Sequence, residues 1–422
     1  MDFLYVLPVI VTLTGAYFLF KLRFFFMLHP KKTAKKIKKA IGEKGAFRSV
    51  SLALAGTLGI GNIIGVAVGI SVGGPGAVFW LFVSSLFAMI IKYAEASLCA
   101  ELGEGKGMIG VVAKSFGTLS RPLSTAYSVL ILALCFIMGS ALQSASIGQC
   151  ATLTLGASEG VTSIILVIVL LFSIIGGARK IEKITVFLIP VTTIIYIFLS
   201  SFTILINIEK MPEVFLNVMS AAFDADSALG GIVGFLLSDK IKEGYLRGIL
   251  SNEAGTGTSS IAHSINKSVD AGAVGVMGML EVVFDTVILC MLTAFATLVS
   301  VDDLSGLSGV QIIMAGIGNV FGGVSQYFLC LCIFAFAYST VICWYYYGSF
   351  AYSCLFGRKS GLLFSVCFLV SAYLGSRVSG DSLIGVTDII LLSLCTISLS
   401  ALIKNSDRIK LLSESSGLIT RH

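Results

Sequence analysis

The feature that most constrains the fold is an apolar stretch at residues 51–76 with an interruption in its middle. The stretch is long enough to span a bilayer, which takes about 20 helical residues. Its centre contains Gly59, Gly61 and Asn62, which weaken a helix. Because a broken helix leaves backbone N–H and C=O groups without partners, a membrane tolerates one only where protein or a water-filled cavity covers it. We therefore expect a discontinuous membrane helix whose ends can bind a small zwitterion and a cation.

The same stretch has a second interpretation as a helix-packing surface. Gly61, Gly65, Gly69 and Gly73 recur every four residues, a spacing typical of closely packed membrane helices. Both interpretations can hold, since the glycine stripe begins where the interruption ends. A nucleotide site is not indicated, because the glycines do not fit G-x-G-x-x-G and no strand–turn–helix context surrounds them.

Composition indicates that the whole chain is a polytopic membrane protein. Hydrophobic residues make up 56% of its 422 residues and charged residues only 12%, whereas soluble domains carry about 25% charged residues. The ten cysteines lie almost entirely in apolar runs without metal-ligand or disulfide-framework spacing, so we interpret them as small core residues. The net charge of +6 does not indicate nucleic acid as a partner, because the basic residues cluster at span ends.

Hydropathy predicts about eleven transmembrane helices. They cover residues 3–27, 49–72, 77–100, 122–152, 160–177, 184–207, 228–261, 271–299, 322–355, 361–378 and 382–403. Most Lys and Arg residues fall in loops on one side of these spans, and the loops on the other side hold only Lys210 and Arg377. The positive-inside rule then places the N-terminus outside and the C-terminus in the cytoplasm of a cell (inner) membrane. The Lys-rich residues 31–39 also suit anionic lipid headgroups.

The spans divide into one accessory helix and two sets of five. The predicted regions are 1–48 (accessory helix and basic cytoplasmic loop), 49–207 (first five-helix repeat), 208–403 (extracellular loop and second repeat) and 404–422 (cytoplasmic tail). An odd number of spans per set gives the halves opposite topology, as in the inverted repeats of secondary transporters. The expected fold is thus all-α with a 5+5 inverted repeat. A second glycine-interrupted run at 228–235 matches the position of residues 56–62 and indicates a transport site.

Polar residues within other spans are further candidates for the site. Gln143 lies mid-span, where its amide suits a substrate carboxylate, an ammonium group or broken backbone, with a helix–helix hydrogen bond as the alternative. Ser339 and Thr340 are adjacent hydroxyls that suit a monovalent cation, although such groups also bond back to a carbonyl one turn earlier. Trp344 shares a face with Thr340 and can wall a pocket. Tyr345–Tyr347 are interpreted as an interfacial belt.

Charged residues within spans are candidates for coupling or gating. Lys92 and Glu95 are three residues apart on a helix and are expected to neutralise each other. Asp285 is expected either to accept hydrogen bonds from an unwound segment or to carry a proton. Arg247 follows a run of charges that either gates the bundle interior or merely ends a cytoplasmic helix. No enzyme is indicated, because the three histidines lack metal spacing and neither G-x-S-x-G nor a P-loop occurs.

Several segments together resemble the alanine or glycine:cation symporter family, whose core is similar to the leucine-transporter fold. The resemblance spans nearly the whole chain and rests on residues 53–80, 92–95, 174–190, 246–263, 279–286 and 334–348. It implies sodium-coupled uptake of alanine, glycine or a similar small amino acid. The implied partners are that amino acid, sodium and membrane lipids, and no cofactor is implied beyond sodium as the coupling ion.

The resemblance also implies a set of site residues. Those implied for the substrate are Thr57, Gly59, Gly61, Asn62, Gln143, Thr340 and Trp344. Those implied for the cation are the carbonyls of Ala55 and Leu58 and the hydroxyls of Ser339 and Thr340. The chain departs from the family at Ile60, where Thr is usual, and at Ser140 and Ala145, where Asn is usual. These departures leave a different small amino acid open as the substrate. Proton coupling, a passive channel and a transporter-like sensor are further alternatives.

Overall fold

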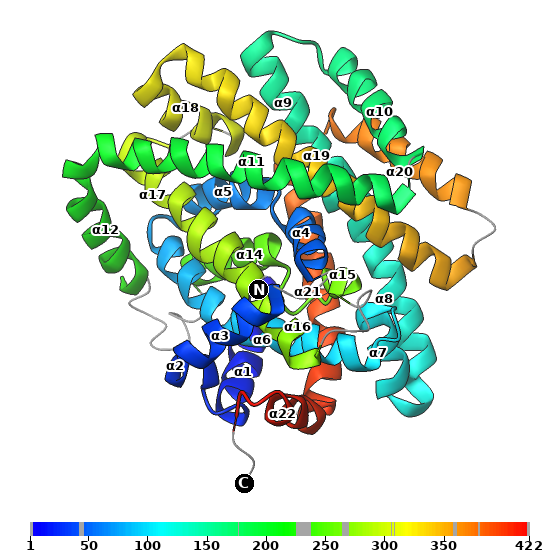
Figure 1. Ribbon diagram of the computed structural model, residues 1–422. Helices are drawn as coiled ribbons and strands as arrows, with labels where there is room; N and C mark the ends of the chain where they lie inside the picture. Colours follow the sequence, from blue (N-terminus) through cyan, green and yellow to red (C-terminus); the bar gives the residue numbers. More distant parts are fainter. Residues whose placement is uncertain are drawn as a thin grey trace.

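The computed structural model describes an all-helical protein over residues 3–41, 46–175, 177–224, 238–263, 270–304, 306–307, 309–357, 361–378 and 380–419. Within these ranges helices are joined by turns and no strand occurs (Figure 1). Seven helical stretches of the described chain are long and apolar enough to cross a membrane. These are Phe3–Lys21, Gly76–Leu102, Gly117–Leu155, Lys183–Ile206, Ala271–Ser300, Gly323–Phe356 and Ser382–Lys404. The all-α, multi-pass class is confirmed, while the count of eleven spans and the inverted repeat stay predictions.

The first half of the chain contains the helices that build the core around the first interruption. They are α1 (Val6–Lys21), α2 (Phe25–Leu28), α3 (Pro30–Ile41), α4 (Ala46–Thr57), α5 (Ile64–Gly73), α6 (Gly76–Leu102), α7 (Gly107–Ser115), α8 (Ser120–Leu134), α9 (Gln143–Leu155), α10 (Glu159–Ile175) and α11 (Gly177–Ile206). A π-helical segment, η4 (Cys135–Leu142), joins α8 to α9 in one continuous rod. Gln143 therefore stands directly after a locally widened helix.

The second half has a comparable series of helices. They are α12 (Met211–Phe223), α14 (Asp239–Asn252), α15 (Ser260–His263), α16 (Ala271–Val282), α17 (Met291–Ser300), α18 (Gly309–Phe321), α19 (Gly323–Phe356), α20 (Gly361–Gly375), α21 (Gly380–Lys404) and α22 (Ser406–Ser415). A second π-helical segment, η6 (Val283–Cys290), joins α16 to α17 and contains Asp285. Figure 1 places α22 and α7 towards one end of the molecule and α10 and α18 towards the opposite end.

In the described residues, two of the expected spans contain a helix break. The first break separates α4 from α5 and contains a short 3₁₀ turn, Ile60–Asn62, as the two glycines and the asparagine predict. The second break, at residues 253–259, separates α14 from α15. The break expected at 228–235 lies outside the described residues. The break at 253–259 interrupts the same predicted span, 228–261, near its other end.

The first predicted span, 3–27, is too long. Helix α1 ends at Lys21, because Arg23 and Phe24 adopt left-handed backbone conformations with φ of 57° and 50°. The chain turns there and continues into α3, whose lysines 31, 32, 35, 38 and 39 are exposed while Thr33 and Ala40 face inward. Such a basic amphipathic helix suits the membrane surface. Among the cysteines most are buried, but Cys354 and Cys367 are exposed rather than in the core.

The glycine stripe on α5 packs against α14, so the helix-packing interpretation holds beside the broken-helix interpretation. A Cβ on Gly69 would lie 2.6 Å from Cγ of Arg247, and one on Gly65 would lie 3.2 Å from Cδ2 of Leu250. Small residues at a helix interface let two backbones approach closely. The stripe thereby holds α5, the second half of the first broken helix, against α14, the first half of the second.

Candidate functional site

Two free carbonyls of the first break converge on one hydroxyl. Oγ1 of Thr340, on α19, lies 3.1 Å from the carbonyl oxygen of Ala55 and 3.3 Å from that of Leu58. Because α4 stops at Thr57, these carbonyls lack the helical partners that a continuous helix would give them. The structure therefore brings together three of the four residues that the resemblance implies for a cation.

Ser339, the fourth residue of that set, has a different partner. Its hydroxyl donates to the carbonyl of Phe336 at 2.8 Å, the back-bonding that the sequence left open as an alternative. Thr57 also bonds back along its own helix, donating to the carbonyl of Ala53 at 3.3 Å. Both side chains are buried, and each hydroxyl finds its hydrogen-bond acceptor within its own helix.

Gly59 and Gln143 meet on the other side of Thr340. A Cβ on Gly59 would lie 2.7 Å from Oγ1 of Thr340 and 3.2 Å from Oε1 of Gln143, so no side chain fits there without displacing one of them. Oε1 of Gln143 accepts a hydrogen bond of 3.3 Å from the backbone N–H of Ile60. The sequence left a substrate group, broken backbone or another helix as partners for this amide, and in the structure it binds the backbone of the first break.

Asn62 ties the first break to two other helices. Its Oδ1 accepts from the N–H of Gly59 at 3.1 Å, which closes the 3₁₀ turn. Its Nδ2 donates to Oγ of Ser251 at 2.8 Å and to Oδ1 of Asp285 at 2.6 Å. Asp285 also accepts hydrogen bonds from the hydroxyls of Ser251 and Thr286. Asp285 thus receives donors from the unwound segment, one of the two roles expected for it.

Lys92 and Glu95 lie beside the second break and also interact with each other through their charges. Nζ of Lys92 donates to the carbonyl of Asn252 at 2.8 Å, where α14 ends. The carboxyl group of Glu95 lies close to the backbone of Gly255 and Gly257 in the second break, and its Oε1 accepts a hydrogen bond of 3.4 Å from Ser398. Those glycines have φ of +86° and +74°, the left-handed region that favours glycine. The interaction between the charges of Lys92 and Glu95 is the one expected from the sequence, and the cation lies at a helix-end carbonyl, which matches the exposed end of a broken helix.

Arg247 faces the bundle interior. Its Nη2 lies 2.5 Å from Oδ2 of Asp388 on α21, and its Nε lies 3.2 Å from Oε2 of Glu243 one turn earlier on α14. All three side chains are buried. The charges that begin α14 are therefore paired with a neighbouring helix, as a gate would require, and their role in gating stays a prediction.

Trp344 lies deep inside the bundle with Tyr347 beside it. The two rings make an edge-to-face contact with centroids 5.6 Å apart, and both side chains are fully buried. The interfacial-belt interpretation is therefore wrong for Tyr347, whose hydroxyl lies close to Gly56. Trp344 also fills the space beside Gly139. A Cβ added to Gly139 would lie 2.4 Å from the Cβ of Trp344. The ring thereby fixes α19 against η4.

A polar cavity of about 260 Å³ is lined in part by residues that neighbour the site in sequence, while Gln143 and Thr340 themselves do not line it. Its wall includes Ile64 and Leu142, the neighbours in sequence of the first break and of Gln143, together with Ala145, Glu159 and Arg377. Ala145, where the resemblance leads one to expect Asn, thus contributes an apolar side chain to this wall. Ser140 instead donates to the carbonyl of Phe368 on α20 at 3.2 Å and does not line the cavity.

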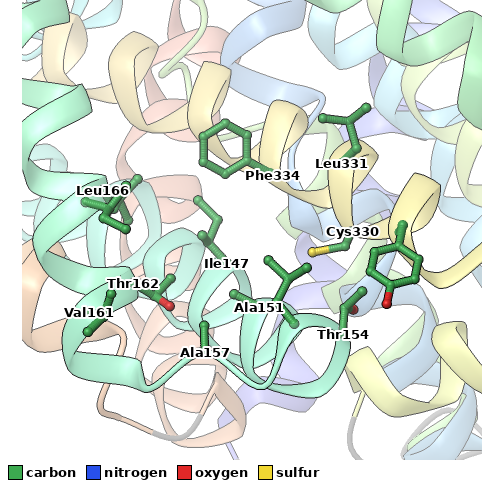
Figure 2. A pocket seen from close by; sticks show the side chains of 13 residues that line it. Ile147, Ala151, Thr154, Ala157, Val161, Thr162, Leu166, Cys330, Leu331 and Phe334 are labelled. Atoms are coloured by element: carbon green, nitrogen blue, oxygen red, sulfur yellow. The ribbon is translucent and has the colours of Figure 1, made fainter.

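A second cavity, of about 340 Å³, lies among α9, α10 and α19 (Figure 2). Side chains such as Ile147, Leu166 and Phe334 point into it, and its lining carries no charged group. A zwitterion would lose its hydration there without gaining a charged partner. This cavity therefore does not suit an amino acid.

Sequence comparison decides the family. The model of the sodium:alanine symporter family matches residues 1–411. The chain belongs to the sodium:alanine symporter family. This is a family of membrane transporters that work by symport. The family implies an amino acid and sodium as the transported species.

Named relatives and a solved structure agree with this family. The chain is 29% identical over 375 residues to the sodium/alanine symporter AgcS of Methanococcus maripaludis, covering 85% of this chain and 80% of that protein. It is 33% identical over 372 residues to the putative sodium/proton-dependent alanine carrier protein YrbD of Bacillus subtilis, covering 80% and 74%. A manganese transporter from Eremococcus coleocola shares the fold, with a TM-score of 0.52, 14% identity and coverage of 88% and 91%.

Most of the residues that meet at the first break could be predicted from the sequence or from the resemblance, among them Asn62, Gln143 and Thr340. Sequence reasoning missed Ser251, which joins Asn62 to Asp285, because one serine on an ordinary helical pattern gives no signal of its own. It also missed Asp388, which the position of Arg247 could have indicated, since a buried guanidinium requires an acidic partner.

Proposed function

We propose that this protein is a secondary active transporter that couples sodium entry to the uptake of alanine, glycine or a similar small neutral amino acid by alternating access. The observation that carries the proposal is the convergence of the Ala55 and Leu58 carbonyls on the Thr340 hydroxyl. Neutral oxygens from an unwound helix and a neighbouring helix are the donors that transporters use for a monovalent cation. A bound sodium would order the first break against α19.

The substrate would bind where the break meets Gln143. Helix α5 begins at Ile64, so its free N–H groups and positive dipole end can meet a carboxylate. Thr340 and Gln143 fill the space beside Gly59, so a substrate would bind there by displacing these two side chains, which favours a small molecule. Ordering of the break by sodium would favour amino acid binding, and the amino acid would favour sodium binding equally, because such coupling is reciprocal.

The polar cavity of about 260 Å³ would serve as the entry to this site. Glu159 and Arg377 in its wall carry the two charges that complement a zwitterion. In the orientation that we propose, with the N-terminus outside an inner membrane and the C-terminus in the cytoplasm, this cavity faces outward. The Arg247–Asp388 pair lies between the outer half of the second broken helix and α21, where its opening and closing would gate the passage.

A proton-coupled or altered-substrate symporter is the second candidate. Relatives carry the names sodium/proton-dependent alanine carrier protein (Bacillus sp.) and probable sodium/glutamine symporter GlnT (Bacillus subtilis). The wall position of Ala145 favours an altered substrate, since its side chain is apolar where the resemblance leads one to expect Asn.

The deciding experiment is uptake of labelled alanine and glycine into proteoliposomes under an inward sodium gradient, an inward proton gradient or no gradient. Accumulation that requires sodium supports the proposal. Accumulation driven only by protons supports the second candidate. Folded protein that accumulates neither amino acid under any gradient, while labelled glutamine accumulates with sodium, contradicts the proposed substrate.

A further inference from the structure

The short helix α22 lies across two long helices, α6 and α16, and packs against both. The hydroxyls of Tyr93, on α6, and Ser413, on α22, lie 2.8 Å apart, and both side chains are buried. A Cβ on Gly272, in α16, would lie 2.5 Å from the Cβ of Ser416 and closer still to its hydroxyl. The chain at the end of α22 therefore reaches α16 only because residue 272 has no side chain.

The two helices under α22 are those that support the breaks. Nζ of Lys92, on α6, binds the carbonyl of Asn252 at the second break. Helix α16 leads into η6, where Asp285 accepts a hydrogen bond from Asn62 of the first break. Docking of α22 therefore ties α21, from which it continues, to the helices that support both breaks.

Other contacts of α22 lie nearer the surface. Asp407 pairs with Lys21 of α1 at 2.6 Å, and Arg408 pairs with Glu101 of α6 at 2.7 Å. The side chain of Asp407 is 92% exposed, and exposed ion pairs contribute little to stability. Within Ser406–Ser415, Ile409 is the apolar side chain that is buried.

Docking of this kind can open while the rest of the protein stays folded. Helix α22 has ten residues, and isolated helices shorter than about 12–15 residues are marginal in water. Elements with few buried apolar contacts are the ones that open locally. We therefore expect α22 to leave α6 and α16 at a small cost in free energy.

Helix α21 joins α22 to the buried Arg247–Asp388 pair. It runs without interruption from Gly380 to Lys404, and Figure 1 shows α22 following its end on the side of the molecule where α1 and α7 lie. Because an α-helix rises about 1.5 Å per residue, Asp388 lies about 24 Å from Lys404. One rod thus carries the ion pair near one end and α22 at the other.

The middle of this rod rests on the second break. Ser398 donates a hydrogen bond of 3.4 Å to Oε1 of Glu95, and a Cβ on Gly255 would lie 3.4 Å from Sγ of Cys395. The side chains of Ser398 and Cys395 are buried. A rod supported in its middle moves its two ends in opposite directions. A tilt that opens the ion pair therefore presses α22 onto α6 and α16, and a tilt that lifts α22 presses the ion pair together.

We propose that α22 is a latch that keeps one side of the protein closed while the Arg247–Asp388 pair opens the other side. Both ends of α21 are closed in this structure, and a tilt of α21 on the second break opens one of them at a time. As a statement about transport the inference rests on the proposed function, to which it adds a device that prevents both sides from opening together. In the proposed orientation the latch closes the cytoplasmic side.

Hydrogen exchange of the full-length protein in lipid nanodiscs, measured by mass spectrometry, reports the docking of α22 without any transport. Peptides that cover residues 406–416 give its exchange rate. We expect Gly272→Leu, whose side chain meets Ser416, to speed this exchange at least tenfold. The matched control is Gly385→Leu on α21, which should leave the rate unchanged because a Cβ on Gly385 meets nothing within 4 Å.

A smaller change covers the case in which Gly272→Leu does not fold. Tyr93→Phe removes only the hydroxyl that contacts Ser413 and should speed exchange of α22 at least threefold. Its control is Tyr196→Phe, which breaks a similar buried contact of 2.7 Å with Thr293 elsewhere in the bundle and should leave α22 unchanged.

The opposite end of α21 supplies the decisive comparison. Asp388→Asn removes the charge that holds Arg247, so the ion pair separates more readily, and α22 should exchange at least threefold more slowly than in the wild type. Asp302→Asn is the control, because it breaks an exposed pair with Lys210 that does not involve α21.

The proposal is overturned by an α22 exchange rate that stays the same or rises in Asp388→Asn, because the two ends of α21 are then not opposed. Equal rates in the wild type, Gly272→Leu and Tyr93→Phe overturn it as well. Sodium-driven alanine uptake by the same proteins separates the latch from the proposed function. Uptake beside an unresponsive α22 leaves symport standing and removes the latch, whereas opposed exchange shifts in protein that transports no amino acid support the latch and contradict the proposed function alone.

Discussion

At the residue scale, Ser339 and Thr340 show that neighbouring hydroxyls serve different partners. Thr340 reaches the free carbonyls of Ala55 and Leu58, whereas Ser339 bonds back to Phe336. We predict that Thr340→Val, which keeps the shape and removes the hydroxyl, raises the sodium concentration for half-maximal uptake at least tenfold. Ser339→Ala should raise it less than threefold. Sodium titration of alanine uptake measures both, and equal effects of the two variants would remove Thr340 from the cation site.

Gly59 supplies a second test at this scale. A methyl group there would meet Thr340 at 2.7 Å and Gln143 at 3.2 Å, and such a clash costs about 1–3 kcal/mol in a packed site. We predict that Gly59→Ala reduces alanine uptake at least tenfold in protein that still folds. Gly385→Ala on α21 is the control, because a Cβ at Gly385 meets nothing within 4 Å. Uptake by Gly59→Ala that equals uptake by Gly385→Ala would show that the break does not adjoin the substrate.

How far the sequence predicts the site depends on the kind of signal each residue leaves. Gly59, Gly61 and Asn62 break a long apolar pattern, so both the break and its position could be predicted. Gln143 was visible as a polar residue mid-span, but which of its possible partners it takes depends on how the helices pack. The Thr340 contacts followed from the resemblance and not from spacing, since residues 285 positions apart leave no local pattern.

At the scale of elements, the second break illustrates a signal that was present and overlooked. Gly255 and Gly257 are separated by one residue, as are Gly59 and Gly61, and follow Asn252 at the end of a helix. The glycines of 228–235 lie in a more apolar run, which is why the break was predicted at the other end of the span. What the sequence could not provide is the support from outside, because Glu95 and Lys92 reach this segment only once α6 packs beside it.

That support gives a stability prediction for the second break. Glu95→Ala removes the carboxyl group beside Gly255 and Gly257 and leaves buried Ser398 without its acceptor, and a buried donor left unpaired costs about 1–3 kcal/mol. We predict a lower free energy of unfolding by that amount and reduced uptake, measured by thermal unfolding in detergent and by transport. Glu159→Ala, at an exposed acid, should change stability by less than about 0.5 kcal/mol. Equal melting curves for the two variants would contradict this account of the break.

At the scale of the whole molecule, Asp270 joins three distant segments. It caps α16 by accepting from the N–H of Ala273 at 3.1 Å, pairs with Lys36 of α3 at 2.8 Å, and accepts from Ser416 at the end of α22. Burial alone would raise the pKa of Asp270, but the hydrogen bonds and charge of Lys36 and Ser416 hold that pKa below its ordinary value. The carboxylate therefore contributes stability that is present above the unfolded pKa, near pH 4, and is lost as pH falls through the lower native value.

The prediction compares wild type with Asp270→Asn, which keeps an N-cap and removes the charge. We expect the wild type to melt at a slightly higher temperature above about pH 5 and the gap to close as pH falls below about 4. Thermal unfolding between pH 3 and pH 7 measures it. A gap that stays constant over this range would show that the charge of Asp270 does not contribute.

The two π-helical segments have a consequence for how the chain can change length. In a π-helical turn the hydrogen bond spans five residues instead of four, so the segment holds more chain than an α-helix of the same rise. Deleting one residue from Cys135–Leu142 would therefore let the rod close into a regular α-helix with the helix beyond it in nearly its present orientation. Deleting two residues would instead rotate that helix by about 100° and turn Gln143 away from Ile60. We expect both deletions to keep the helical circular dichroism and only the double deletion to abolish uptake. The π-helical segments thus let these rods lose one residue without changing where the side chains beyond them point.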